Sequence, residues 1–229
     1  MKKFLLTVLM FFVFSSVPAY GASSIENHAF NAPDHVATNR YTLTKYLTRP
    51  YSSDYDKLKV IAYWIASHIA YDGYKYNSGK TDMKEMNYQY DVLQYRTGIC
   101  TDFAQLFVDM AKIAGVSGVE YVRGYVLENQ NMIKRNYTRR DINKDAGHAW
   151  NRVQLDRRTF FVDTTFMARG HIGGDRIRAA SSLKHKIDLR KRQYNSTVNT
   201  QINVNFFDFT PKQELRKFGT IHLMEKYIH

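Results

Sequence analysis

The chain has 229 residues, a formal net charge of +12 and a single cysteine, and 44% of its residues are hydrophobic. That length supports one domain that buries about 70% of its unfolded surface, so its core does not depend on disulfide bonds. The positive charge favours anionic partners or simply keeps the protein soluble, and a nucleic-acid partner is not expected, because zinc-finger spacing and aromatic–basic RNA-binding motifs are both absent.

Residues 1–21 predict a secretory signal that is cleaved on export. Two lysines precede an apolar run from Phe4 to Phe14, and small residues surround the expected cleavage position after Gly21. The run is too short to span a membrane, so no transmembrane anchor is expected after cleavage. Because the pattern is bacterial in type, we expect a periplasmic or secreted protein.

Residues 22–53 are polar and contain two prolines, which predicts a loosely structured lead-in with one short helix from Tyr41 to Leu47. In "DYDKLKVIAYWIASHIAYD", apolar side chains recur at three- and four-residue steps behind Asp54 or Asp56 as N-cap, so a helix is expected. The next stretch, "GYKYNSGKTDMKEMNYQY", is rich in glycine, asparagine and tyrosine and predicts a surface loop.

A second helix is predicted over "CTDFAQLFVDMAKIAG", where Phe103, Phe107 and Met110 share one face and Gly115 supplies the stop. Cys100 therefore lies in the first turn. A single cysteine in an exported chain is a buried apolar filler, half of an intermolecular disulfide or a reactive nucleophile. The helix start favours the nucleophile, because oriented backbone N–H groups stabilise a thiolate there.

The second half of the chain predicts strands. "GVEYVRGYVL" is β-branched and aromatic, and "HAWNRVQL" and "TFFVDTTF" form two further strands around a turn at Asp156 and Arg157. Residues 128–146 have no periodicity and predict a loop that is functional or mobile. The basic tail, residues 169–229, is expected to pack on the core as an extension, with a strand at "INVNFFDF".

The turn fixes a register for the predicted hairpin. If residues 156 and 157 form a two-residue turn, Leu155 pairs with Arg158, and one face is then consistently apolar: Ala149, Val153, Leu155, Phe160 and Val162. The opposite face carries His148 and Asp163 as diagonal neighbours, about 7–8 Å apart and within side-chain reach. A shift of one residue would scatter both sets, so the pattern specifies this register.

Cys100, His148 and Asp163 supply three complementary chemical roles. A thiolate attacks an amide carbonyl, and a histidine within hydrogen-bond reach forms an ion pair with it and then protonates the leaving amine. An aspartate on the far ring nitrogen fixes the tautomer and the orientation of the imidazole. For Asp163, capping of the turn after its strand is the structural alternative.

In this order, "GICTDFA", "GHAWNRVQL" and "FFVDTTF" resemble the three signature blocks of the transglutaminase-like superfamily, and "YWIASHIAYD" resembles the helix before the cysteine block in microbial members. The resemblance covers residues 54–168. It implies an α+β, papain-like fold in which the cysteine helix packs on an antiparallel sheet that carries the histidine and the aspartate. It also implies Cys100, His148 and Asp163 as catalytic residues, protein or peptide amides as substrates, and a thioester released to water or to an amine, with no cofactor and no metal.

Two departures from animal transglutaminases bear on the reaction. Those enzymes place tryptophan directly after the cysteine, where this chain has Thr101, and a calcium-loop pattern is absent. Calcium-dependent cross-linking is therefore not favoured, and hydrolysis is at least as well supported.

The oxyanion donors are predicted from position. The backbone N–H of Cys100 is the first one. Gln94 lies six residues before Cys100, a spacing reminiscent of the oxyanion glutamine in papain-like peptidases, although a solvated glutamine is the alternative. Trp150 either packs around the hairpin or lines the site.

A basic cluster in "KHKIDLRKR" either docks on an anionic cell-envelope surface or forms a solvated helix face; it consists of Lys184, Lys186, Arg190, Lys191 and Arg192. The rival to an enzyme is a non-catalytic envelope module that keeps the same fold and holds a partner with the basic tail or with residues 128–146. The complete set of three candidate residues favours the enzyme.

Overall fold

The computed structural model describes residues 22–78, 88–127, 147–168, 171–172, 202–210 and 222–225, and the structural statements below refer to these residues. The predicted signal at 1–21, the loop at 128–146 and the basic cluster at 184–192 lie outside them and stay predictions. Within the described ranges, no helix combines the length and the apolar character needed to cross a membrane.

The described residues of the first half of the chain are mainly helical. The helices are α1 (Ala22–Phe30), η1 (Asp34–Thr38), α2 (Arg40–Thr48), α3 (Asp54–His68), α4 (Gly73–Ser78), α5 (Tyr88–Tyr95) and α6 (Cys100–Ile113). Two further short helical segments follow the strands, namely α9 (Thr164–Met167) and η3 (Val204–Phe206).

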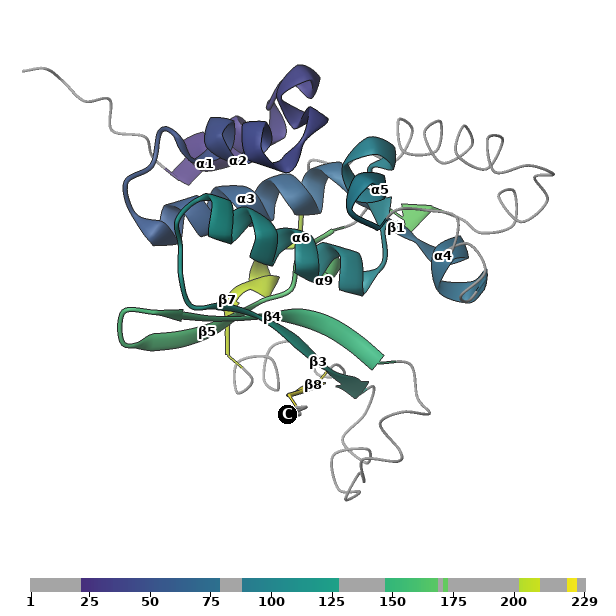
Figure 1. Ribbon diagram of the computed structural model, residues 1–229. Helices are drawn as coiled ribbons and strands as arrows, with labels where there is room; N and C mark the ends of the chain where they lie inside the picture. The colour runs from purple at the N-terminus through teal and green to yellow at the C-terminus, as the bar shows by residue number, and fades with distance from the viewer. Residues whose placement is uncertain are drawn as a thin grey trace, which may run out of the picture.

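Two sheets accompany the helices. The main sheet has five antiparallel strands in the order β7 (Phe207–Phe209), β5 (Arg158–Val162), β4 (Gly147–Leu155), β3 (Val119–Leu127) and β8 (His222–Glu225). A small parallel sheet has the order β2 (Thr97–Gly98), β1 (Ala70–Asp72) and β6 (His171–Ile172). Two short segments of the C-terminal extension, β7 and β8, thus form the two edges of the main sheet (Figure 1).

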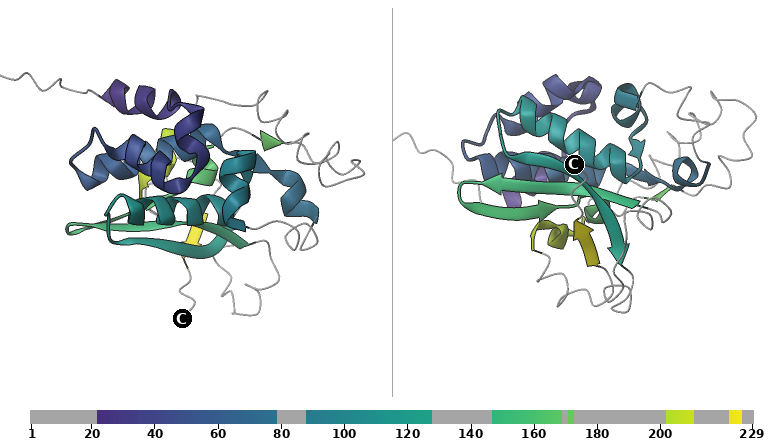
Figure 2. Two further views of the ribbon diagram at one scale, coloured as in Figure 1. Left: turned by 45° about the horizontal axis from the view of Figure 1, so that its top comes forward. Right: turned by 60° about the horizontal axis from the view of Figure 1, so that its bottom comes forward.

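The helices are layered on one face of the main sheet. Helix α6 packs on β3 and β4, α3 packs on α6, and α1 and α2 pack on α3 (Figures 1 and 2). The largest fully buried side chains lie between these layers and include Trp64, Phe103, Phe107 and Phe160. The structure therefore confirms the predicted α+β architecture, with the cysteine helix on an antiparallel sheet.

The short helix predicted from Tyr41 to Leu47 is confirmed, but the expectation that the rest of residues 22–53 is loosely structured was wrong, because α1 and η1 precede that helix. The predicted helix lies inside α2, whose N-cap Asn39 accepts a hydrogen bond from the Thr42 N–H. Leu43 and Leu47 of α2 have no exposed surface. Polar composition misled the prediction for residues 22–38, because only one stripe of a helix has to be apolar to join the core.

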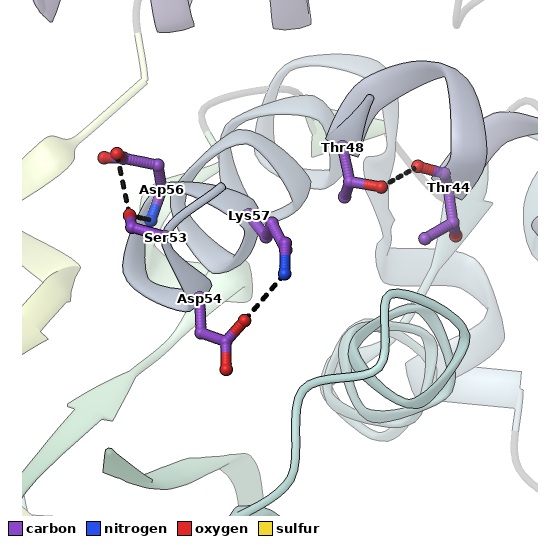
Figure 3. Close-up of polar contacts among 6 residues, drawn as sticks. All are labelled: Thr44, Thr48, Ser53, Asp54, Asp56 and Lys57. Carbon is purple, nitrogen blue, oxygen red and sulfur yellow. Dashed lines mark hydrogen bonds and ion pairs between the residues drawn. The ribbon is translucent and has the colours of Figure 1, made fainter. Parts of the chain in front are cut away.

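Helix α3 is confirmed, but its cap is Ser53 and neither of the predicted aspartates. The Ser53 hydroxyl accepts a hydrogen bond from the Asp56 N–H at 3.0 Å and donates one to the Asp56 carboxylate at 2.8 Å (Figure 3). Asp54 instead pairs with Lys57 at 2.7 Å on the surface of the helix. The two aspartates stabilise the first turn through its dipole.

The stretch predicted as a surface loop after Asp72 contains helical segments at both of its described ends. Asp72 starts α4, since its Oδ1 accepts a hydrogen bond from the Lys75 N–H at 2.8 Å. The last residues of the stretch open α5 at Tyr88. Glycine, asparagine and tyrosine favoured a loop in the sequence, but an aspartate cap and tertiary contacts override that local preference here.

The hairpin register is confirmed in full. Leu155 pairs with Arg158, and the ladder runs back to Asn151 and Val162, as a two-residue turn requires. Asp156 takes a positive φ of 55°, a conformation that aspartate tolerates in such turns. The predicted strand at 202–209 is confirmed only for Phe207–Phe209, because the residues before it form η3.

Candidate active site

Cys100 is the first residue of α6, as the sequence predicts. The residue before it, Ile99, is extended with φ −105° and ψ 176°, so the chain turns into the helix at the cysteine itself. The side chain of Cys100 is 5% exposed and packs with Ala104 and Ala149, with Tyr121 against them. The first N–H groups of a helix have no intrahelical acceptor, so this thiol lies at the positive end of the helix dipole.

The helix starts there because Asp102 and Gly98 allow it. Asp102 Oδ2 accepts a hydrogen bond from the Ile99 N–H at 2.8 Å, which is the reverse half of a capping box. A β-carbon on Gly98 would lie 2.7 Å from Asp102 Cβ, too close for two carbon atoms. A residue without a side chain is therefore required at position 98 for the chain to start α6 in this conformation.

His148 and Asp163 meet in a buried hydrogen bond. His148 Nε2 lies 2.6 Å from Asp163 Oδ2, and their side chains are 8% and 0% exposed. The other oxygen of Asp163 accepts a hydrogen bond from the Phe166 N–H at 3.0 Å and caps α9. The two readings of Asp163 offered by the sequence, ring orienter and turn cap, are thus both present in the geometry, one on each oxygen.

The ring of His148 is held between aromatic side chains. It stacks on Phe166 at 4.5 Å and on Trp150 at 5.9 Å, with an interplanar angle of 21° in both cases. Trp150 is 1% exposed, so it supports the imidazole from inside the core. This burial corresponds to the packing alternative for Trp150 more closely than to a position on the site wall.

Charge and hydrogen bonding favour a protonated imidazole. Burial alone would lower the pKa of His148, but the charge and hydrogen bond of Asp163, together with the hydrogen bond and charge of Cys100, raise it to about 10. The ring therefore has Asp163 as partner at Nε2 and Cys100 as a further partner. An imidazolium in this position is the counter-ion that a thiolate needs.

Asn151 joins the histidine strand to the cysteine helix. Its Nδ2 donates to the backbone carbonyl oxygens of Ala104 at 3.0 Å and Glu120 at 3.3 Å, and the residue has no exposed surface. The link connects β4 to α6 one turn beyond Cys100. Asn151 thus holds the strand that carries His148 against the helix that carries Cys100.

Gln94 is not brought into this group in the described structure. It lies in α5 with an exposed side chain, and among the described residues no hydrogen bond joins it to Cys100. The side-chain oxyanion donor proposed from sequence therefore stays a prediction. The backbone N–H of Cys100 lies at the start of α6, where helix N–H groups have no intrahelical acceptor, and its role as oxyanion donor also stays a prediction.

Two tyrosines near Cys100 were not predicted. Burial, and next the charge of Cys100, raise the pKa of Tyr71. Burial also raises the pKa of Tyr121, with the Arg123 charge lowering it and the Cys100 charge raising it. Tyr71 lies on β1 in register with Gly98, and Tyr121 lies on β3. The β1–β2 pairing brings Tyr71 near Cys100, and the β3–β4 pairing brings Tyr121 near it, so the spacing of these tyrosines in the sequence did not predict their position.

Comparison with known proteins decides the family. The family model described as the transglutaminase-like superfamily matches residues 41–164, which is more than half of the chain. The chain belongs to the transglutaminase-like superfamily. The match begins inside α2, so this superfamily domain includes part of the segment that the sequence assigned to a lead-in before residue 54.

Two individual proteins are similar to this transglutaminase-like chain. The kyphoscoliosis peptidase of Mus musculus is 28% identical over 117 residues, which is 50% of this chain and 16% of that protein. A solved structure described as "Crystal structure of a TGase" is 17% identical and has a TM-score of 0.34, over 75% of this chain and 39% of that one. The chain thus spans well under half the length of either relative.

Proposed function

We propose that this protein is a cysteine enzyme that acts on protein or peptide amides through a thioester. Cys100 is the nucleophile, His148 the base and then the acid, and Asp163 the residue that orients the imidazole. The observation that carries the proposal is the buried 2.6 Å bond from His148 Nε2 to Asp163, with Cys100 as a further partner of the same ring. Membership of the transglutaminase-like superfamily supports it.

The reaction begins with the ion pair. The Cys100 thiolate attacks the amide carbon, and the tetrahedral oxyanion accepts a hydrogen bond from the Cys100 N–H at the start of α6. The imidazolium of His148 donates its proton to the leaving amine, and a thioester remains on the sulfur. The neutral imidazole then takes a proton from water or from an amine, which attacks the thioester and frees Cys100.

Asp163 acts through the ring and keeps its own charge. Its Oδ2 accepts the Nε2 proton, which leaves the other ring nitrogen for exchange with Cys100 and the leaving group. The cap on α9 fixes the carboxylate from the other side. Because the aromatic contacts fix the ring plane as well, the imidazole enters the reaction already oriented.

The experiment that tests this function offers the protein a glutamine peptide, with and without a primary amine, and follows products by mass spectrometry. Hydrolysis gives the glutamate product or cleaved peptide, and transamidation gives the amine adduct. Cys100→Ala should abolish every product while the fold stays intact. Turnover that persists in this variant would refute the mechanism, and a folded wild-type protein without any thiol reactivity would point to a non-catalytic binding module.

Export is a second part of the proposal and rests on the pattern of residues 1–21. We infer that the mature enzyme works in the periplasm or outside the cell. N-terminal sequencing of the protein purified from its natural source tests this directly. A mature chain that starts near residue 22 is the expected result, and an intact start at Met1 would contradict it.

A further inference from the structure

A buried ion pair lies beside the nucleophile and takes no part in the Cys–His–Asp set. Lys75 Nζ lies 2.8 Å from Asp102 Oδ2, and their side chains are 8% and 0% exposed. Burying two charges removes their hydration, and such pairs often add little to stability compared with apolar residues of the same size. Its position suggests a role in the chemistry of the neighbouring thiol.

Asp102 holds a negative charge close to Cys100. It lies two residues after the cysteine in the first turn of α6, and its Oδ2 also accepts the Ile99 N–H at 2.8 Å. Its other oxygen is buried and has no hydrogen-bond partner among the described residues. A carboxylate next to a thiol opposes formation of the thiolate and of the oxyanion that follows it. The start of α6 thus depends on the hydrogen bond that Asp102 accepts, but formation of the Cys100 thiolate is favoured only if the negative charge of Asp102 is neutralised.

Lys75 reaches Asp102 from a separate element that is fixed in register with the cysteine segment. Strand β1 pairs with β2 through Tyr71 and Gly98, two residues before Cys100. Asp72 at the end of β1 then accepts the Lys75 N–H at 2.8 Å and starts α4. The β1–β2 pairing and the Asp72 cap of α4 therefore place the Lys75 ammonium group at the first turn of α6.

We propose that Lys75 is a positioning residue for Cys100. By neutralising Asp102, it lets the carboxylate hold the start of α6 without placing a net negative charge beside the thiol. This inference rests on the proposed role of Cys100 as nucleophile. It predicts that the pH profile of Cys100 reactivity depends on a lysine that touches neither the substrate nor the sulfur.

Several other titratable or charged groups surround the thiol and have to be kept constant in a test. His148 faces it from β4 with Asp163 behind it, and Tyr71 and Asp72 come from β1. From β3 come Tyr121 and Arg123. None of these groups is altered by a change at position 75, and Lys75 is the cation that contacts Asp102. Removing its charge therefore isolates the effect of Asp102.

The test is the rate of Cys100 alkylation by iodoacetamide as a function of pH. Because the chain has one cysteine, the label reports this site alone. Lys75→Met should slow alkylation near neutral pH roughly tenfold, because the unpaired carboxylate of Asp102 then opposes the thiolate. Lys75→Arg keeps the charge and should leave the profile close to that of the wild type. A folded Lys75→Met protein with the wild-type profile would overturn the proposal.

Asp102→Asn removes the other charge of the ion pair, and it tests the proposal if Lys75→Met does not fold. It removes the carboxylate and keeps the ammonium, so the profile should move downward; an unchanged or higher profile would overturn the proposal. Lys57→Met breaks the Lys57–Asp54 pair on the surface of α3 and is the matched control, with no change expected. Failure of the proposed function looks different, since the wild-type thiol would then be unreactive at neutral pH.

Discussion

At the scale of single residues, Asp163 combines a structural and a chemical task. One oxygen caps α9 through the Phe166 N–H, and the other bonds His148 Nε2. The β4–β5 ladder ends at Asn151 and Val162, and the Asp163 N–H donates to the Phe206 carbonyl oxygen at 2.9 Å as the chain turns into α9. Because the cap fixes the carboxylate, its hydrogen bond to Nε2 orients the imidazole together with the stacking of Phe166.

The two tasks of Asp163 can be separated by substitution. Asn is as good a helix cap as Asp, so Asp163→Asn should keep α9 and the fold while removing the charge that favours the imidazolium. Turnover should fall by about three to four orders of magnitude, as expected for loss of an orienting aspartate. Asp163→Ala should in addition lose about 1 kcal/mol of stability with the cap. Kinetics and urea unfolding of both variants measure this, and near-wild-type turnover in Asp163→Asn would contradict the assigned role.

The pH dependence of stability follows from the raised pKa of His148, about 10 in the folded protein against 6.5 for the free side chain. A base with a raised pKa stabilises the fold fully below its unfolded pKa, and this contribution is lost as pH rises through the folded value. The stability difference between wild type and Asp163→Asn should therefore be largest at about pH 6 and shrink towards about pH 10. Denaturant titrations across this window test it, and a difference that grows with pH would be inconsistent with the pair.

At the scale of elements, the position of the nucleophile depends on how β2 leads into α6. Trp64 of α3 stacks on His68 at 4.8 Å, and the Arg96 guanidinium lies 4.8 Å from the same indole. Arg96 has a positive φ of 54° immediately before β2. The end of α3 thus contacts the turn that precedes Gly98. Burial, and to a smaller extent the charge of Arg96, lowers the pKa of His68 to about 4, so this ring is neutral in the stack.

Gly98→Ala tests the entry into α6. The new β-carbon would lie 2.7 Å from Asp102 Cβ, so the first turn must shift, at a cost of about 1–3 kcal/mol. We expect slower alkylation of Cys100 as well as a lower melting temperature.

Gly115→Ala, at the far end of the same helix, is the matched control. Its φ of 79° makes alanine unfavourable by about 1 kcal/mol, but nothing lies within 4 Å of the added carbon. This variant should lose stability and keep the thiol reactivity. Equal loss of reactivity in both variants would show that general destabilisation, and not the geometry of the helix start, controls Cys100.

At the scale of the whole molecule, α1 and α2 pack with the helix and the sheet that carry the candidate site residues. Arg40 of α2 forms an ion pair with Asp109 of α6, and Leu43 and Leu47 are fully buried against the other helices. The superfamily match beginning at residue 41 agrees with this inclusion of α2. A domain boundary at residue 54 would cut through this packing.

Leu47→Ala should therefore destabilise the entire protein. Removing a fully buried leucine side chain leaves a cavity and costs about 2–5 kcal/mol. Urea unfolding followed by both circular dichroism and Cys100 alkylation should give a single, shifted transition. A loss confined to the first helices, with the thiol still protected, would mean that they form a separate unit.

Local patterns predicted the parts of the fold that are set by nearby residues. The turn at Asp156, with its positive φ, fixed the hairpin register, and the apolar stripe with Gly115 delimited the cysteine helix. The sequence missed the helices before α2, namely α1 and η1, because polar residues outnumber large apolar ones in residues 22–38. It also missed the Lys75–Asp102 pair, since 27 residues separate the partners and only the β1–β2 pairing brings them together.

The central claim is that Cys100 and His148 form an ion pair oriented by Asp163, and the pH profile of Cys100 alkylation in wild type and His148→Ala tests it most directly. At neutral pH, the wild-type thiol should be alkylated faster than an ordinary thiol, because the imidazolium is its counter-ion. In His148→Ala, alkylation at the same pH should slow to the rate of an ordinary thiol. Identical profiles in the two proteins would contradict the claim.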